Sequence, residues 1–285
     1  MILSFHSCFL SDTQVILGDG VLDAHDRRHI EAADVIILPQ TCPLELYQAC
    51  KNASALLFPN YEARFEYPGK IGQSRLFIDL GLPHPKTKQW SSVKAFKDRH
   101  PKGAPFPHEV PFVIKADKAH EAEGVHIIED SATLESALKP MERLEGSSLS
   151  GFVSQEWIET QGNVLRVVIM GRSIRSYWKR AEGSGQKVAA ISRGAKIDED
   201  WRPDLQEKGK TQAQRLSAVT GINLAAIDFV FPFSHHNPEP LFLEVNYSFG
   251  RQGLGGSRNF FLLLFTVLQE WLVEKGFDPN LVTLL

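Results

Sequence analysis

Two oxygen-bearing side chains stand two residues apart at the end of an apolar run. The run LFLEVNYSFG, residues 241–250, carries Glu244 and Asn246. Successive side chains of a strand point to opposite faces, so these two would share one face. They could be solvated surface residues, but the earlier run AAIDFVF adds Asp228 on what looks like the hairpin partner of this strand. Three oxygen donors on adjacent strands suit Mg²⁺ (or Mn²⁺), which takes few protein ligands and shares the rest with water and phosphates.

A lysine upstream has a context typical of phosphate binding. Lys115 ends the β-rich run PFVIKAD, residues 111–117, and a short loop leads from there to Gly124 and Val125. A lysine at a strand end is most often simply solvated. A cation that enters such a loop is nevertheless well placed to meet phosphate oxygens.

The elements that would position these residues mix helices with strands. Apolar runs of period two predict strands over residues 34–40, 54–60, 111–117, 124–130, 150–158, 187–192, 225–233 and 241–248. The runs NVLRVVIMG and RSIRSYWKR predict a hairpin that turns at Gly171 and Arg172. Helical spacing predicts helices over residues 44–52, 69–81, 131–144, 204–221 and 257–275. Residues 89–110, rich in Lys, Pro and His, look like a connector. The mixture predicts an α+β fold with a parallel N-terminal part and antiparallel sheets after it.

Composition limits the class of protein. The 285 residues, 43% of them hydrophobic and 23% charged, describe a soluble globular chain of two or three compact units. The net charge of −3 gives no reason to expect a nucleic acid or a membrane surface as partner. Three cysteines without metal spacing, and an N-terminus without a basic signal region, lead us to expect a cytoplasmic protein.

In this order, the motifs resemble the ATP-grasp superfamily, specifically its RimK-like and glutathione-synthetase-like amino-acid ligases. The resemblance runs from about residue 34 to residue 256. PGKIGQSRLFIDLGLPHPKT is similar to the family's segment in which a lysine opens a helix, and PFVIKADKAHEAEGVHII is similar to its lysine strand and phosphate loop. SQEWIE resembles the family's adenine-side hinge, and RVVIMGRSIRSYWKR resembles its Arg-strand-Gly-strand-Arg pattern. AAIDFVF and LFLEVNYSFG together resemble its paired metal-binding strands. The resemblance implies a small α/β domain over residues 1–88, followed by ATP-grasp subdomains over residues 89–150 and 151–285 that hold ATP between them.

The resemblance also implies a role for each matching residue. The phosphates of ATP would be bound by Lys70 and Lys115, and Mg²⁺ by Asp228, Glu244 and Asn246. The adenine pocket would be lined, mostly through backbone, by Gln155, Glu156, Trp157 and Ile158. The reacting phosphate and acyl groups would be faced by Arg166, Arg180 and Arg193. Arg166 and Arg180 lie on paired strands, so we expect both to point to one face.

The implied activity is an ATP- and Mg²⁺-dependent carboxylate–amine ligase. It would form an amide through an acyl phosphate, with a small molecule or peptide that carries a carboxylate and an amine as acceptor. Relatives commonly carry an Arg and an Asn where this chain has Val188 and Ala190. Two alternatives therefore stay open: a nucleotide-binding sensor or partner subunit without ligase activity, and a small-molecule kinase. A homo-oligomer formed through the apolar last helix is also left open.

Overall fold

The computed structural model describes residues 1–17, 21–117, 124–143, 151–181 and 194–285. Within these residues, three sheets follow one another along the chain, and a small two-stranded ribbon joins its two ends. The first sheet is parallel, and the two larger ones that follow are antiparallel. This is the predicted α+β class.

The N-terminal unit is a four-stranded parallel sheet in the order β3-β1-β4-β5. Its elements are β1 (Ile2–Ser4), β3 (Thr13–Gln14), α1 (Ala24–Ala32), β4 (Val35–Ile37), α2 (Leu44–Lys51) and β5 (Leu56–Phe58). The central strands are fully buried and, apart from Ser4, apolar, as parallel strands covered on both faces usually are. The predicted strands at 34–40 and 54–60 and the predicted helix at 44–52 are confirmed.

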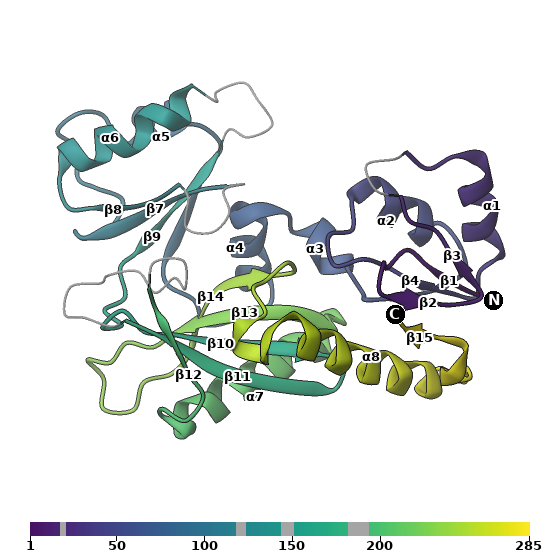
Figure 1. Cartoon of the computed structure of the whole chain (residues 1–285). Coiled ribbons are helices and arrows are strands. Elements are labelled where there is room, and N and C mark those ends of the chain that lie inside the picture. The colour runs from purple at the N-terminus through teal and green to yellow at the C-terminus, as the bar shows by residue number, and fades with distance from the viewer. Residues whose placement is uncertain (18–20, 118–123, 144–150, 182–193) are drawn as a thin grey trace.

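The C-terminal end of the chain returns to this unit. The long helix α8 (Gly256–Glu274) packs Leu264 and Leu268 in one core with Ile2 and Val35 of the parallel sheet. After η3 (Pro279–Leu281), β15 (Thr283–Leu284) pairs antiparallel with β2 (Phe9–Leu10). The two chain ends therefore lie close together (Figure 1).

The second sheet has the order β6-β9-β7-β8, from β6 (Thr87–Trp90), β7 (Phe112–Ala116), β8 (Val125–Ile128) and β9 (Phe152–Glu156). Helices α5 (Val93–Arg99) and α6 (Ser131–Glu142) cover one face, where Phe112 and Phe152 join Phe96 in a core. The prediction of a connector at 89–110 is wrong in part, because β6 and α5 begin there and bury Trp90 and Phe96. The expected domain boundaries at 88 and 150 cut through this sheet.

The third sheet has the order β12-β11-β10-β13-β14. It consists of β10 (Val164–Met170), β11 (Ser173–Arg180), β12 (Lys196–Asp198), β13 (Leu224–Val230) and β14 (Leu241–Asn246). Helix α7 (Pro203–Thr220) covers one face, and α8 covers part of the other. Met170 pairs with Ser173, which confirms the predicted hairpin turn at Gly171 and Arg172. The predicted strand at 187–192 lies outside the described residues.

Two helices connect the N-terminal unit with the antiparallel sheets. These are α3 (Glu62–Glu66) and α4 (Gly69–Asp79), which lie between the two parts of the molecule (Figure 1). A short 3₁₀ turn, η2 (Gln252–Leu254), precedes α8. Among the described helices, none combines the length and the apolar character that crossing a bilayer requires.

Candidate functional site

Helix α4 is fastened to both antiparallel sheets, and this fixes the position of Lys70 in its first turn. On one side, Asp117 follows β7 and accepts hydrogen bonds from the N–H groups of Ile71 (2.7 Å, to Oδ1) and Lys70 (3.1 Å, to its carbonyl). On the other side, the Gln73 amide donates to the carbonyl of Val245 in β14 (2.8 Å) and accepts from its N–H (3.0 Å). The start of α4 is thus held between the strand that carries Lys115 and the strand that carries Glu244.

A glycine permits the close approach of α4 to β7. Gly69 has φ +68°, and a Cβ there would lie 2.6 Å from Oδ1 of Asp117. Glycine alone adopts this backbone conformation readily and leaves room for the carboxylate.

A narrow cleft, here called the central cleft, opens between these elements. Lys115 donates from Nζ to Oε1 of Gln155 (2.7 Å), and Nζ of Lys70 lies 3.7 Å from Oε1 of Glu244. The full lining comprises Lys70, Gln73, Ser74, Phe77, Thr87, Lys115, Val153, Gln155, Leu243 and Glu244. The cleft therefore brings together both predicted phosphate-binding residues, one predicted hinge residue and one predicted metal ligand.

The charge of Lys115 is tuned by its surroundings. Burial lowers its pKa to about 8, the nearby Glu244 and Asp228 carboxylates oppose this, and Lys70 adds to the decrease. Lys115 is therefore mostly charged at neutral pH. An anion in the central cleft would favour the charged form further.

Asp228 is the hub of a second, buried cluster beside the cleft. The strand register sets Arg166, Asp228 and Glu244 directly opposite one another on β10, β13 and β14. Arg166 donates to both carboxylate oxygens of Asp228, from Nε (2.8 Å) and from Nη2 (2.8 Å). Lys179 adds a third bond from Nζ to Oδ2 (2.9 Å), and Nδ2 of Asn246 is 3.5 Å from the same oxygen.

The charges of this cluster reinforce one another. Burial alone would raise the pKa of Asp228, but Arg166 and Lys179 outweigh it and hold the carboxyl far below its usual range. Burial lowers the pKa of Lys179, and Asp228 opposes that shift. Burial alone would lower the pKa of Arg166, but Asp228 and Tyr177 together outweigh it, so its pKa rises. Asp228 and Arg166 are therefore ionised at neutral pH.

The predicted metal ligands have the chemistry that a hard divalent cation requires. Asp228, Glu244 and Asn246 offer carboxylate and amide oxygens from neighbouring strands, and the Glu244 side chain is 35% exposed. They fit Mg²⁺ by donor type. Both oxygens of Asp228 already accept from Arg166 and Lys179, so an ion at this carboxylate would share it with those two cations.

Arg180 lies on the opposite face of the sheet, so the expectation that it shares a face with Arg166 is wrong. Arg166 lies directly opposite Tyr177 on β11, so these two side chains share a face. Because side chains alternate along a strand, Lys179 lies on the same face as Arg166 and Arg180 lies on the other. Arg180 instead pairs with Oδ2 of Asp198 (2.7 Å) and lies over the ring of Trp201, with 4.3 Å to the centroid. Arg193, together with Val188 and Ala190, lies outside the described residues.

Lys179, Asp117 and Gln73 are site residues that the motifs did not indicate. A signal for Lys179 existed, because a two-residue turn at Gly171 and Arg172 already fixes which residues of the second strand share a face with Arg166. Asp117 and Gln73 act on backbone groups far away in the sequence, so no local pattern indicates them.

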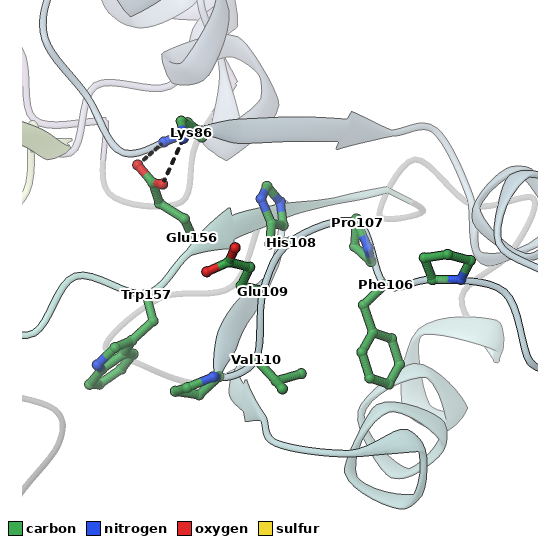
Figure 2. A pocket seen from close by; sticks show the side chains of 10 residues that line it. Lys86, Phe106, Pro107, His108, Glu109, Val110, Glu156 and Trp157 are labelled. Atoms are coloured by element: carbon green, nitrogen blue, oxygen red, sulfur yellow. Dashed lines mark hydrogen bonds and ion pairs between the residues drawn. The ribbon is translucent and has the colours of Figure 1, made fainter.

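The four predicted hinge residues diverge. Gln155 points into the central cleft, and Glu156 points to the other face of β9, where Lys86 binds it through its N–H (2.7 Å) and through Nζ (3.8 Å) (Figure 2). Glu156 and Trp157 border a wide cleft of about 890 Å³, lined by Lys86, Pro105, Phe106, Pro107, His108, Glu109, Val110, Pro111, Glu156 and Trp157. Ile158 packs with Val164 and Val230 of the third sheet. The chain thus passes from the second sheet to the third at this point.

The same arrangement of sheets occurs in solved structures. A RimK domain ATP-grasp protein from Sphaerobacter thermophilus superimposes with a TM-score of 0.57 over 92% of this chain and 97% of that one, at 15% identity. The chain has the ATP-grasp fold. The ATP-grasp fold predicted from the sequence is therefore confirmed.

Two further ATP-grasp comparisons agree. An N5-carboxyaminoimidazole ribonucleotide synthetase in complex with ADP gives a TM-score of 0.61 at 12% identity, covering 85% of this chain and 60% of that one. A D-alanine–D-alanine ligase from Helicobacter pylori gives 0.58 at 16% identity, with 82% and 71% covered. The chain thus spans about three fifths of the length of the synthetase. No protein-family model and no curated protein matches the sequence.

Proposed function

We propose that this chain is an ATP- and Mg²⁺-dependent carboxylate–amine ligase that joins an amino acid or peptide through an acyl phosphate. One observation supports this above all others: Lys70 and Lys115 meet Glu244 in the central cleft, next to the buried Arg166–Asp228–Lys179 cluster. Two cations suited to phosphate thus lie opposite oxygen donors suited to a metal. The ATP-grasp fold and the order of the motifs agree with this.

The proposed reaction has two steps. A carboxylate oxygen of the substrate attacks the γ-phosphorus of ATP, and ADP leaves to give an acyl phosphate. The amine of the acceptor then attacks the acyl carbon, loses a proton and expels inorganic phosphate. Such phosphoryl transfer depends on positioning and on neutralising charge.

The residues of this chain would supply both. Lys70 and Lys115 would bind the phosphates, the hinge at Gln155, Glu156, Trp157 and Ile158 would contact the adenine, and Arg166 would face the transferred group. The bidentate bond to Asp228 supports the role of Arg166, because it fixes the guanidinium plane before substrate binds. We assign to Lys179 the cationic role that the sequence suggested for Arg180, while Arg193 remains a candidate. Asp228, Glu244 and Asn246 would hold Mg²⁺, which would supply neutralisation of the phosphate charge.

The direct test is ATP-dependent phosphate release with a panel of amino acids and peptides, together with mass spectrometry of the products. We expect ADP, phosphate and an amide from the wild type, and a loss of at least about 100-fold in Glu244→Ala, as for removal of one electrostatic stabiliser. Glu239→Ala is the matched control, since Glu239 is exposed and forms a surface ion pair with Lys208. Activity that Glu244→Ala leaves unchanged would exclude the assigned site.

The same experiment separates the two alternatives. ADP accompanied by a stable phosphorylated product, with no amide, would identify a small-molecule kinase. Nucleotide binding in a calorimeter without turnover on any acceptor would identify a nucleotide-binding protein without ligase activity. We further propose a cytoplasmic location, which the three free thiols of Cys8, Cys42 and Cys50 support.

A further inference from the structure

Two arginines from distant parts of the sequence meet at the carboxyl edge of the N-terminal parallel sheet. Arg64, on α3, donates from Nη1 to the carbonyl oxygen of Gln40, which follows β4 (3.2 Å). Arg251, which follows the strand of Glu244, donates from Nη2 to Oε1 of the same residue (3.2 Å). Gln40 therefore holds a guanidinium on each of its two oxygens. In open α/β sheets this edge is where ligands bind.

The two positive charges are positioned but not neutralised. Arg64 lies over the rings of Tyr61 and Phe65, with 5.1 Å and 4.9 Å to the centroids. Arg251 lies in the same way over two phenylalanine rings at the start of α8, at 4.7 Å and 4.4 Å. Within the described part of the chain, neither guanidinium forms an ion pair with a carboxylate. Aromatic faces hold the side chains in place and leave donors for a ligand.

Gln40 adds a third donor to this edge. The residue is 7% exposed, and its Nε2 is buried without a hydrogen-bond partner among the described residues. Buried amide donors are rarely left unpaired in native proteins. Each guanidinium has five N–H donors, more than the bonds to Gln40 and, for Arg251, the 3.4 Å bond from Nη1 to Oγ of Ser257 use. Two guanidinium groups with donors to spare and an unpaired amide N–H have the donor pattern that binds an oxyanion.

We propose that Arg64, Arg251 and Gln40 form an oxyanion site for a carboxylate or phosphate group of the acceptor, distinct from the group that reacts. The proposal rests on the ligase function proposed above. Arg251 follows Asn246 by five positions, so at most about 18 Å of chain joins the metal strand to this site. That reach fits an amino acid or a short peptide with a free carboxylate. The acceptor is thus acidic at the end remote from the new bond.

Anion binding is measured first without nucleotide, using succinate and inorganic phosphate as probes at constant ionic strength and succinamide as neutral control. Thermal unfolding reports the affinity, because a ligand of the native state raises the melting temperature. We expect at least one anion to stabilise the wild type, while Arg64→Gln and Arg251→Gln each weaken its binding by about 10- to 100-fold. Arg28→Gln, an exposed arginine on α1, should respond like the wild type.

The outcomes are separable. Stabilisation by succinate alone assigns the site to a carboxylate, and stabilisation by phosphate alone assigns it to a phosphate. If no anion stabilises the wild type, or both variants respond as the wild type does, the oxyanion site is excluded even where ligase activity is found. Conversely, anion binding lost in both variants, without any amide formed from ATP, leaves the site standing and excludes the ligase.

Discussion

Asp228→Asn tests the buried charge cluster because it removes one negative charge and leaves two cations facing each other. Asp228 is 4% exposed and accepts three charge-assisted bonds, two from Arg166 and one from Lys179. An asparagine has nearly the same shape, but its NH₂ group cannot accept from either cation. The variant therefore removes the charge of the hub and little of its volume.

The expected cost is large. Removing one partner of a buried ion pair typically costs about 3–5 kcal/mol, since the remaining charge is buried without compensation. At roughly 2–4 °C per kcal/mol for a domain of this size, the melting temperature should fall by about 6–20 °C. Asp198→Asn is the control, because its pair with Arg180 is more exposed and should cost about 1 kcal/mol or less.

A second variant identifies the cause. Lys179→Met in the Asp228→Asn background removes one of the two stranded cations, so the double variant should be more stable than Asp228→Asn alone. Urea denaturation followed by circular dichroism measures both differences. The charge cluster is weaker than proposed if the free energy of unfolding of Asp228→Asn lies within about 1 kcal/mol of the wild-type value. The same holds if the effects of the two substitutions on the free energy of unfolding simply add.

Three further changes have defined outcomes. ATP affinity, measured by calorimetry from pH 6.5 to 9.5, should fall by up to about tenfold per pH unit above pH 8, because Lys115 loses its proton there. The affinity of Lys115→Arg should not change with pH over this range, and equal pH profiles for wild type and variant would refute the role of Lys115. Burial, assisted by the charge of Arg251, lowers the pKa of His6 to about 4, so between pH 6.5 and pH 4 the unfolded state binds a proton that the folded state does not. The free energy of unfolding should therefore fall by up to about 3 kcal/mol as pH falls over this range. His6→Leu should lose this pH dependence, and an unchanged slope in the variant would contradict the prediction. Gly253→Ala places a Cβ 2.2 Å from the buried Tyr177 ring and should lower the free energy of unfolding by about 1–3 kcal/mol. Gly250→Ala, with open space around the new Cβ, should leave it unchanged. Equal effects of the two substitutions would show that the Tyr177 ring can move aside at no cost.

The long elements were predictable from sequence because each carries its own pattern. The hairpin of β10 and β11 follows from two β-rich runs around Gly171, and α7 ends at Gly221, which adopts φ +70°. Strands β1 and β3, of three and two residues, were not predicted, because neither shows a period of its own. Helix α5 was missed because its polar sequence hides the apolar positions, Val93 and Phe96, that the core requires.

The chemistry of the site was predictable in kind and less so in detail. The types and order of Lys70, Lys115 and Glu244 indicated residues that the structure does bring together. The predicted face of Arg180 was wrong. The two-residue turn at Gly171 and Arg172 pairs Arg166 with Tyr177, and the alternation of side chains along the strand then puts Arg180 on the other face. The bonds of Asp117 to α4 and of Gln73 to β14 join residues 46 and 172 positions apart, and such contacts exist only once the sheets have assembled.

The most direct measurement of the central claim is a crystal structure with a non-hydrolysable ATP analogue and Mg²⁺. We expect the triphosphate between Lys70 and Lys115, and an ion bound by oxygens of Asp228, Glu244 and Asn246. A triphosphate bound in the wide cleft instead, away from Lys70 and Lys115, or a central cleft that holds neither phosphate nor metal at saturating concentrations, would contradict the account.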